Sequence, residues 1–471
     1  MSFVSFSYLF LLIFALGVRA FLRDRRDVDT YPRFLLVASL IFYASYVPRY
    51  VFLLLAVTLL DFYLGLGIAK TESRKLKRIL LSVSILSNVG ILAFYKYAAF
   101  IVDNLRIVSS AIELPIFQYT HLNLILPLGI SFFVFQSMSY NWDVYRGVLK
   151  PERRYWRFLL FVSFFTHLIS GPIVRGKELI YQFGRRRRFH VVVAFEGVYY
   201  LILGFFLKKV VADNLALYVN NYWRNDYISS CSSGSAFLLA LYFSCQIFSD
   251  FAGYTSIAWG SAYLLGFRLP ANFNHPYLAA SFREFWMRWH ITLSRWMRDY
   301  LYIPLGGNRV SSLRVYLNLW VVMLVAGLWH GAAWTFIAWG GLHGSALVVE
   351  RALGWERSQG RAAWVGLPCF LIVQAVVLIG WILFRSKDFG QAGLMVERLL
   401  SGSHGLAPAD ELIRGIAFVV PIFLMHAWGF LREHGWVLAW SPVHRAVLCA
   451  IMLFCIWSLS GGDSEFIYFH F

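Results

Sequence analysis

Two histidines lie where a side chain could carry out acid–base chemistry at membrane depth. His330 ends an apolar run and lies between Gly327 and Gly331. An imidazole titrates near neutral pH, so it can take a proton from a hydroxyl that attacks a thioester and return it to the leaving group. The glycines would let a ligand approach the ring. The alternative is a histidine that hydrogen-bonds two membrane helices together.

The second histidine, His290, lies in an amphipathic stretch. On an unbroken helix, Arg283, Met287, His290 and Ser294 would share one face, because they are three or four residues apart. Nearby arginines could hold a phosphate-bearing donor such as coenzyme A; these are Arg283, Arg288, Arg295 and Arg298. The alternative, which composition alone favours, is an interfacial helix whose tryptophans anchor at the headgroups while its arginines extend to water.

A third histidine, His343, follows His330 by thirteen residues. On an unbroken helix this spacing puts the two on nearly opposite faces, so we expect His343 to pack or to support the site. The catalytic patterns of soluble enzymes, HxxxD, HExxH and GxSxG, do not occur. The five cysteines form no ligand pattern, and we expect neither a disulfide nor a metal site. Gly462-Asp463-Ser464 imitates an esterase motif, but too few residues follow it to build that fold.

The composition of the chain indicates whether water or lipid surrounds these residues. Of 471 residues, 59% are hydrophobic and only 14% are charged, against about a quarter in soluble proteins. Inside lipid every backbone amide needs an internal partner, and long continuous apolar runs select helices over a barrel. The sequence therefore predicts an all-α, polytopic membrane protein.

The apolar runs predict eleven to thirteen membrane segments, some of them half-helices. They extend over about 3–20, 34–47, 50–69, 79–100, 122–140, 157–173, 191–212, 235–266, 313–330, 332–350, 366–384, 413–431 and 444–460. Residues 267–312 are the least regular stretch and suggest an interfacial or re-entrant element beside a wet cavity. The first run lacks the basic start and cleavage site of a signal peptide, so we expect it to stay attached as a span.

The net charge of +18 could indicate a nucleic-acid binder. The basic residues instead gather between apolar runs, near 19–33, 70–78, 146–157 and 175–188, as cytoplasmic loops require. We therefore expect a lipid bilayer and no nucleic acid as partner. The polar loops are too short for a soluble catalytic domain of about 100 residues, so residues 1–471 are predicted to form a single integral membrane domain whose chemistry lies in its helices.

Several strings, taken in order, resemble the membrane-bound O-acyltransferase (MBOAT) family, in its bacterial alginate and cellulose O-acetylation branch. The densest strings run from Phe248 to Tyr254, from Asn272 to Tyr277, from Phe282 to His290, from Arg298 to Arg309, and from Gly327 to Gly331. Pro127 to Phe132 and Ser170 to Pro172 also look familial, and the core motif region covers about 122–350. Ala252 stands where serine is frequent, and Met287 where arginine is common.

The resemblance implies a ring of helices around a central funnel, with His330 as the central catalytic residue and His290 as the second active-site histidine. It makes other residues candidates to line a donor site or tunnel: Arg283, Trp286, Ser294, Asp250, Trp329 and Asn308. It implies no permanently bound cofactor, and acetyl-CoA or another acyl thioester as donor. The stretch Glu465–Phe471 resembles a motif linked to acyl handover.

The function implied is transfer of an acetyl group from a cytoplasmic donor across the bacterial inner membrane for O-acetylation of an exopolysaccharide. Alginate is the first expectation for the polymer and cellulose the second, with a periplasmic SGNH-type acetyltransferase as partner. Whether His330 acts as a base or is transiently acylated stays open. The alternative is a transporter of a polysaccharide or lipid-linked precursor without acyl chemistry, but the paired interrupted helices expected of one are not evident.

Overall fold

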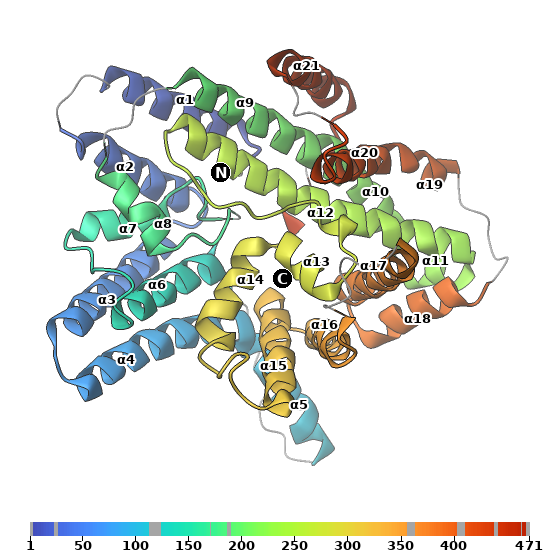
Figure 1. The fold of residues 1–471 in the computed structure, drawn as a ribbon, viewed down its shortest axis with the longest axis horizontal. Helices are drawn as coiled ribbons and strands as arrows, with labels where there is room; N and C mark the ends of the chain where they lie inside the picture. Colours follow the sequence, from blue (N-terminus) through green and yellow to red (C-terminus); the bar gives the residue numbers. More distant parts are fainter. Residues whose placement is uncertain are drawn as a thin grey trace. The chain divides into compact units, whose positions relative to one another are not determined.

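The computed structural model describes residues 3–22, 27–112, 124–169, 171–185, 190–355, 363–402, 410–437, 441–462 and 464–467. Within these ranges the chain forms helices and turns and no β-sheet (Figure 1). The helical class predicted from the long apolar runs is therefore confirmed.

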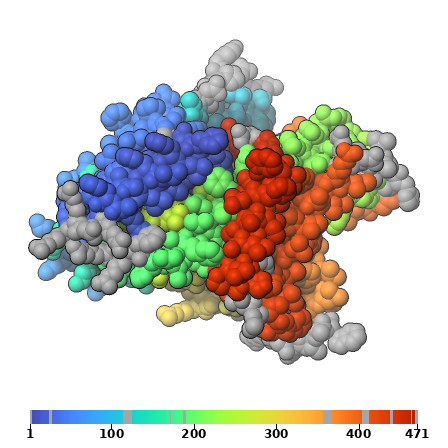
Figure 2. Space-filling model, turned by 90° about the horizontal axis from the view of Figure 1, so that it is seen from above, coloured from blue at the N-terminus to red at the C-terminus, as the bar shows by residue number. Residues whose placement is uncertain are grey.

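Eight helical stretches among the described residues are long and apolar enough to cross a membrane. They are Tyr50–Lys70, Arg74–Ala111, Val191–Tyr222, Ser233–Leu264, Ser312–His330, Gly366–Arg385, Leu412–Glu433 and Pro442–Leu459. Only 6% of the residues of Pro442–Leu459 are buried, so most of this helix is exposed (Figure 2).

The expected eleven to thirteen segments exceed this number because several apolar runs fold into shorter helices. The first two runs become helices of 16 and 15 residues, Phe6–Phe21 and Thr30–Ala44. The run 157–173 becomes a nine-residue helix, Tyr155–Ser163, followed by irregular chain. In the described part of the run 122–140, which starts at residue 124, the helix begins only at Ile130, after Gly129 adopts a left-handed conformation with φ of 67°.

The chain divides into two compact units, and the boundary between them falls within two helices, α9 (Val191–Phe205) and α12 (Ser233–Leu264). Unit 1 contains Met1–Val198 and Ala258–Pro270. Its helices are α1 (Phe6–Phe21), α2 (Thr30–Ala44), α3 (Tyr50–Lys70), α4 (Arg74–Leu92), α5 (Ala98–Ala111), α6 (Ile130–Tyr145), α7 (Tyr155–Ser163) and α8 (Gly176–Phe183), with a π-helical turn, η1 (Ala93–Tyr97).

A buried polar cluster joins three helices of unit 1. The carboxylate of Asp61 on α3 accepts hydrogen bonds from Ser84 (2.5 Å) and Asn88 (2.7 Å) on α4 and from Asn141 (2.8 Å) on α6. Asp61 is fully buried. Because a buried polar group is costly without partners, this cluster fixes how α3, α4 and α6 pack.

Unit 2 contains Tyr199–Ile257 and Ala271–Phe471. Its remaining helices are η2 (Phe206–Ala212), α10 (Asp213–Tyr222), α11 (Asn225–Ser230), η3 (Pro276–Leu278), α13 (Phe282–Arg288), α14 (Ile291–Met297), η4 (Arg298–Tyr302), α15 (Ser312–His330), α16 (Trp334–Ala352), α17 (Ala363–Arg385), α18 (Phe389–Leu400), α19 (Asp410–Arg414), α20 (Ile416–Glu433) and α21 (Pro442–Leu459). The irregular nature predicted for 267–312 is confirmed, because short helices and turns fill it.

Glycines bring α15 and α16 into close contact, and the two helices lie side by side in Figure 1. A Cβ atom added to Gly327 would lie 2.3 Å from the backbone oxygen of Phe336, and one added to Gly340 would lie 2.4 Å from that of Met323. A Cβ at Gly331 would lie 2.2 Å from the Phe336 ring. The sequence interpretation, that these glycines open access to His330, is therefore replaced by a packing role.

Candidate active site

His330 lies at the last position of α15, where its ring is enclosed by aromatic side chains. Its ring centroid lies 5.0 Å from that of Trp339 on α16, 5.3 Å from that of Phe384 on α17 and 4.9 Å from that of its neighbour Trp329. Only 2% of His330 is exposed. The three helices thus hold the imidazole in one place.

His343 joins the same cluster from α16. Its ring lies 5.0 Å from Trp339 and 5.1 Å from Trp286, which comes from α13. The prediction that His343 points away from His330 is wrong, because a break at residues 331–333 separates their helices and both rings contact Trp339. His343 is fully buried. The expectation that it packs or supports the site fits this position.

His290 does not lie on a continuous helix. Helix α13 ends at Arg288 and α14 begins at Ile291, and His290 between them has a φ of 42°, an uncommon conformation for a residue with a side chain. Backbone bonds from Asn274 N–H to Arg288 O (3.0 Å) and from Ile291 N–H to Asn272 O (2.9 Å) hold the break. Strain of this kind persists where the surroundings impose it, often at functional sites.

The helix face predicted from residues 283, 287, 290 and 294 is therefore wrong. Arg283 and Met287 are exposed, whereas His290 is fully buried. Because α13 ends before His290 and α14 begins after it, the side chain of His290 points into the protein and not along the exposed face of Arg283 and Met287.

The hydrogen bonds of Asn272 set the tautomer of His290. The Oδ1 atom of Asn272 accepts bonds from the hydroxyl (2.9 Å) and the backbone N–H (3.3 Å) of Thr292, which identifies it as the amide oxygen. Nδ1 of His290 lies 3.0 Å from this oxygen and must donate to it. The proton is therefore on Nδ1, and Nε2 keeps its lone pair.

The surroundings of His290 keep this nitrogen unprotonated. Phe251 meets the ring edge-on at 4.7 Å, and Trp329 lies 5.8 Å away. Nε2 has no hydrogen-bond partner in the part of the chain that the structure describes. Burial lowers the pKa of His290 to about 3, so the ring is neutral at physiological pH. Trp329 also contacts His330, so one indole separates the two histidines.

Two carboxylates fix α13, which carries Trp286 into the cluster. Glu350 on α16 accepts hydrogen bonds from the backbone N–H groups of Phe282 and of Arg283 (3.2 Å), at the N-terminus of α13, where negative charge is favourable. Ser281 caps the same end by accepting from the N–H of Glu284 (3.0 Å). At the other end, Arg288 forms a two-pronged ion pair with Glu433 on α20 (2.7 and 2.8 Å).

The expected cationic site for donor phosphates is only partly present. Arg288 is held by Glu284 and Glu433, and Arg298 pairs with Asp299 at 2.7 Å. Paired arginines have less capacity to bind a ligand's phosphate. Arg283 and Arg295 are exposed, so a phosphate from outside the protein could reach them.

The structure gathers some of the predicted site residues and separates others. Trp286 and Trp329 join the histidine cluster. Ser294 is half-buried and donates weakly to the carbonyl of Trp289 (3.4 Å). Asn308 is exposed, where it accepts a hydrogen bond from Tyr302 (2.6 Å).

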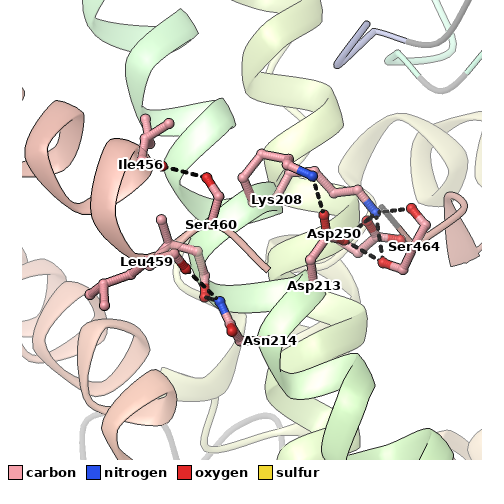
Figure 3. A network of polar contacts seen from close by, with 10 residues as sticks. Lys208, Asp213, Asn214, Asp250, Ile456, Leu459, Ser460 and Ser464 are labelled. Carbon is pink, nitrogen blue, oxygen red and sulfur yellow. Dashed lines mark hydrogen bonds and ion pairs between the residues drawn. The ribbon is translucent and has the colours of Figure 1, made fainter. Parts of the chain in front are cut away.

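Asp250 belongs to a buried ionic cluster instead of lining the histidines. Its carboxylate lies 2.9 Å from Nζ of Lys208, and Lys208 also lies 2.8 Å from Asp213 (Figure 3). Lys209 pairs with the second oxygen of Asp213 at 3.1 Å. We call Lys208, Lys209, Asp213 and Asp250 the anchor cluster; its two cations and two carboxylates balance within membrane helices.

Sequence reasoning missed Asn272, Phe251, Glu350 and Lys208 as site or supporting residues. Asn272 and Phe251 lie inside strings that carried the family resemblance, so the signal was present there. Glu350 and Lys208 are ionisable residues within apolar runs, and that alone is a signal of function. Among the described residues no group of three or more His, Cys, Asp or Glu side chains is placed to hold a metal ion.

The arrangement therefore holds buried imidazoles in aromatic surroundings, with one defined lone pair on Nε2 of His290. Such a nitrogen can accept a hydrogen bond from a substrate, and an imidazole is the side chain that most often transfers protons in acyl transfer.

Comparison with known proteins agrees with this chemistry. Residues 154–355 match the model of the MBOAT, membrane-bound O-acyltransferase family. A Pseudomonas aeruginosa protein named "Probable alginate O-acetylase AlgI" is 40% identical over 85% of this chain and 76% of its own length. A Helicobacter pylori peptidoglycan O-acetyltransferase is 36% identical over 79% and 74%. A Bacillus subtilis teichoic acid D-alanyltransferase is 28% identical over 57% and 70%.

All three relatives are named as enzymes that move acyl groups, and two of them exceed 35% identity over most of both chains. With its multiple apolar helices, this chain is a multi-pass membrane acyltransferase and belongs to the MBOAT family.

Proposed function

We propose that this chain transfers an acetyl group from acetyl-CoA, or from another acyl thioester, across the bacterial inner membrane for O-acetylation of an exopolysaccharide. Alginate is the proposed polymer, and cellulose is second. The name of the 40%-identical Pseudomonas relative supports the reaction and the polymer. The proposal includes a periplasmic SGNH-type partner that completes the modification, and residues 1–471 working as one membrane domain with its core at about 122–350.

The observation that carries the proposal is the pair of buried histidines, His290 and His330, that share contacts with Trp329. Both lie inside the segment that matches the family model. Aromatic walls exclude water, which protects a thioester from hydrolysis and strengthens polar interactions with a substrate.

In the proposed reaction His330 is the general base. The acceptor hydroxyl attacks the thioester carbonyl while His330 takes its proton, and the tetrahedral intermediate then expels the thiolate. The thiolate receives that proton, so a hydroxyl and a thioester become an ester and a thiol. His290 keeps a lone pair on Nε2, and we assign it a hydrogen bond from an N–H or O–H group of the bound substrates.

The test is acetylation by cells that lack their own acetylase. Wild-type protein should restore acetyl esters in the exported polymer, measured by NMR, and His330→Ala should reduce them at least 100-fold, since general acid–base groups contribute about 10² to 10⁴. His434→Ala is the matched control, because His434 is exposed at the end of α20. Equal membrane levels and equal elution from a sizing column must accompany the loss; full acetylation by His330→Ala would refute the proposal.

The polymer is tested separately in two hosts, one that makes alginate and one that makes cellulose, each with its own periplasmic partner. Acetyl esters in alginate but not in cellulose would support alginate as the polymer. The reverse result would move the assignment to cellulose. Release of free thiol from acetyl-CoA by the purified protein in liposomes would identify the donor.

A further inference from the structure

We infer that the segment Ser464–Ile467, which we call the docked segment, positions His290, and that the anchor cluster holds this segment in place. The inference rests on the role proposed above for His290. It concerns positioning through packing, by way of Phe251, and assigns no chemical step to the docked segment.

The docked segment is bound to the anchor cluster by three kinds of contact (Figure 3). Lys208 Nζ donates to the carbonyl of Ser464 (2.8 Å) and to its hydroxyl (3.2 Å), and that hydroxyl donates to Asp213. The backbone N–H of Ile467 donates to Asp250 (2.7 Å). Since the side chains of Lys208 and Asp213 are fully buried, these bonds are not exchanged for bonds to water.

Just before the docked segment, the backbone at Gly461 packs closely against the backbone of the helix that carries the two lysines. The N–H of Gly461 donates to the carbonyl of Lys209 (2.8 Å), and a Cβ on Gly461 would lie 2.9 Å from the backbone nitrogen of Asn214. A second close approach sets Lys208 against α12, because a Cβ on Gly253 would lie 3.0 Å from the backbone nitrogen of Lys208. The string from Phe248 to Tyr254 thus has a physical reason for its glycine.

Phe466 carries the position of the segment to the histidine. It is fully buried, and its ring lies 4.3 Å from Tyr254 and 5.9 Å from Phe251 on α12. Phe251 in turn meets the ring of His290 edge-on at 4.7 Å. Asp250 precedes Phe251 in the chain and Ile467 follows Phe466, and the backbone N–H of Ile467 donates a hydrogen bond to Asp250. Docking of the segment and support of the His290 ring are therefore one packing unit.

The alternative explanation is that the docked segment only stabilises the folded protein. The two explanations differ in what happens when His290 is absent. If Phe466 acts through His290, removing both should cost no more activity than removing His290 alone. If it acts on general stability, the two losses should multiply.

The experiment measures thiol release from acetyl-CoA by full-length protein in liposomes, with the polymer and the periplasmic partner present to supply the acceptor hydroxyl. Phe466→Ala should lower kcat about tenfold or more with little change in KM, because misplacing a reacting group by about 1 Å costs up to about 100-fold. Phe466→Leu should recover most of the rate by refilling the space. Lys387→Met is the control, since Lys387 is exposed in the same unit and lies outside both the docked segment and the histidine cluster.

The double variant His290→Ala/Phe466→Ala should match His290→Ala in rate. A further loss of the same size as in Phe466→Ala alone would overturn the inference, as would an unchanged kcat in Phe466→Ala. If Phe466→Ala does not fold, Asp250→Asn, which weakens the bond to the N–H of Ile467, is carried through the same cycle with His290→Ala. A wild-type protein without any thiol release would instead refute the proposed function, so the two failures are distinguishable.

Discussion

At the scale of single residues, the hydrogen bond from His290 to Asn272 decides which nitrogen of this imidazole keeps its lone pair. We expect Asn272→Ala to lower the acetylation rate by about 10- to 100-fold, because the ring loses its tautomer and its orientation. Asn274→Ala should leave the rate close to that of wild type, since its side chain is exposed. The rates are compared at equal membrane levels, and a full rate in Asn272→Ala would remove Asn272 from the site.

Burial of His290 also predicts how stability depends on pH. Its folded pKa of about 3 lies below the ordinary value of 6.5, so the unfolded chain binds more protons between these values. The stabilising contribution is complete above pH 6.5 and is lost as the pH falls toward 3. We expect His290→Gln to lose less stability than wild type between pH 7.5 and pH 4.5, as measured by thermal unfolding in detergent. Equal losses in the two proteins would contradict the assignment.

Much of the site could be predicted from residue types, but its geometry could not. His290, His330, Trp286 and Trp329 were all named from the sequence, and the structure gathers them. The left-handed conformation of His290 has no sequence signal, because glycine or asparagine usually occupies such positions. The pairing of Arg288 with Glu433 joins residues 145 positions apart, and no local pattern records it.

At the scale of helices, the contact between α15 and α16 places His330 and His343 around Trp339. Gly340→Ala would put a methyl group 2.4 Å from the backbone oxygen of Met323, whereas at Gly341 the nearest atom, in the side chain of Leu324, would be 3.8 Å away. We expect Gly340→Ala to destabilise the protein by about 1–3 kcal/mol and to lower activity. Gly341→Ala should be neutral within about 0.5 kcal/mol. Unfolding in detergent measures both, and equal stability of the two variants would refute this packing role.

Helix positions were predicted well wherever an apolar run was long and continuous. The runs 235–266, 313–330 and 332–350 correspond to α12, α15 and α16 within a few residues. Runs that contain special backbone positions were predicted poorly. Gly129 precedes α6, which begins only at Ile130. Outside the runs, the break at His290 interrupts the helix face assumed for residues 283–294. Hydropathy indicates whether a segment prefers lipid to water, and it carries no information about backbone dihedral angles.

At the scale of the whole molecule, composition and the long continuous apolar runs were enough to predict a helical membrane protein, because lipid admits only helices and closed barrels and such runs favour helices. Among the described residues, eight helical stretches are long and apolar enough to cross a membrane. They are fewer than the apolar runs because some runs form shorter helices. The ring of helices around a funnel stays a prediction. The function was predicted from strings of residues, spread over the chain, that resemble a known family. Physical reasoning alone would have left a choice between an enzyme and a transporter.

The last prediction concerns the anchor cluster. Its ion pairs are buried, so the stability of unit 2 should depend on the balance of their charges. Lys208→Met leaves Asp250 without its cation and Asp213 with only Lys209, and breaking a buried pair in this way costs about 3–5 kcal/mol. The double variant Lys208→Met/Asp250→Asn should recover part of that loss, because asparagine removes the unpaired charge and can still accept from the N–H of Ile467. Lys387→Met, at an exposed position of the same unit, should change stability by less than about 0.5 kcal/mol. Thermal unfolding in detergent ranks the variants, and a double variant less stable than Lys208→Met would show that charge balance is not what the cluster supplies.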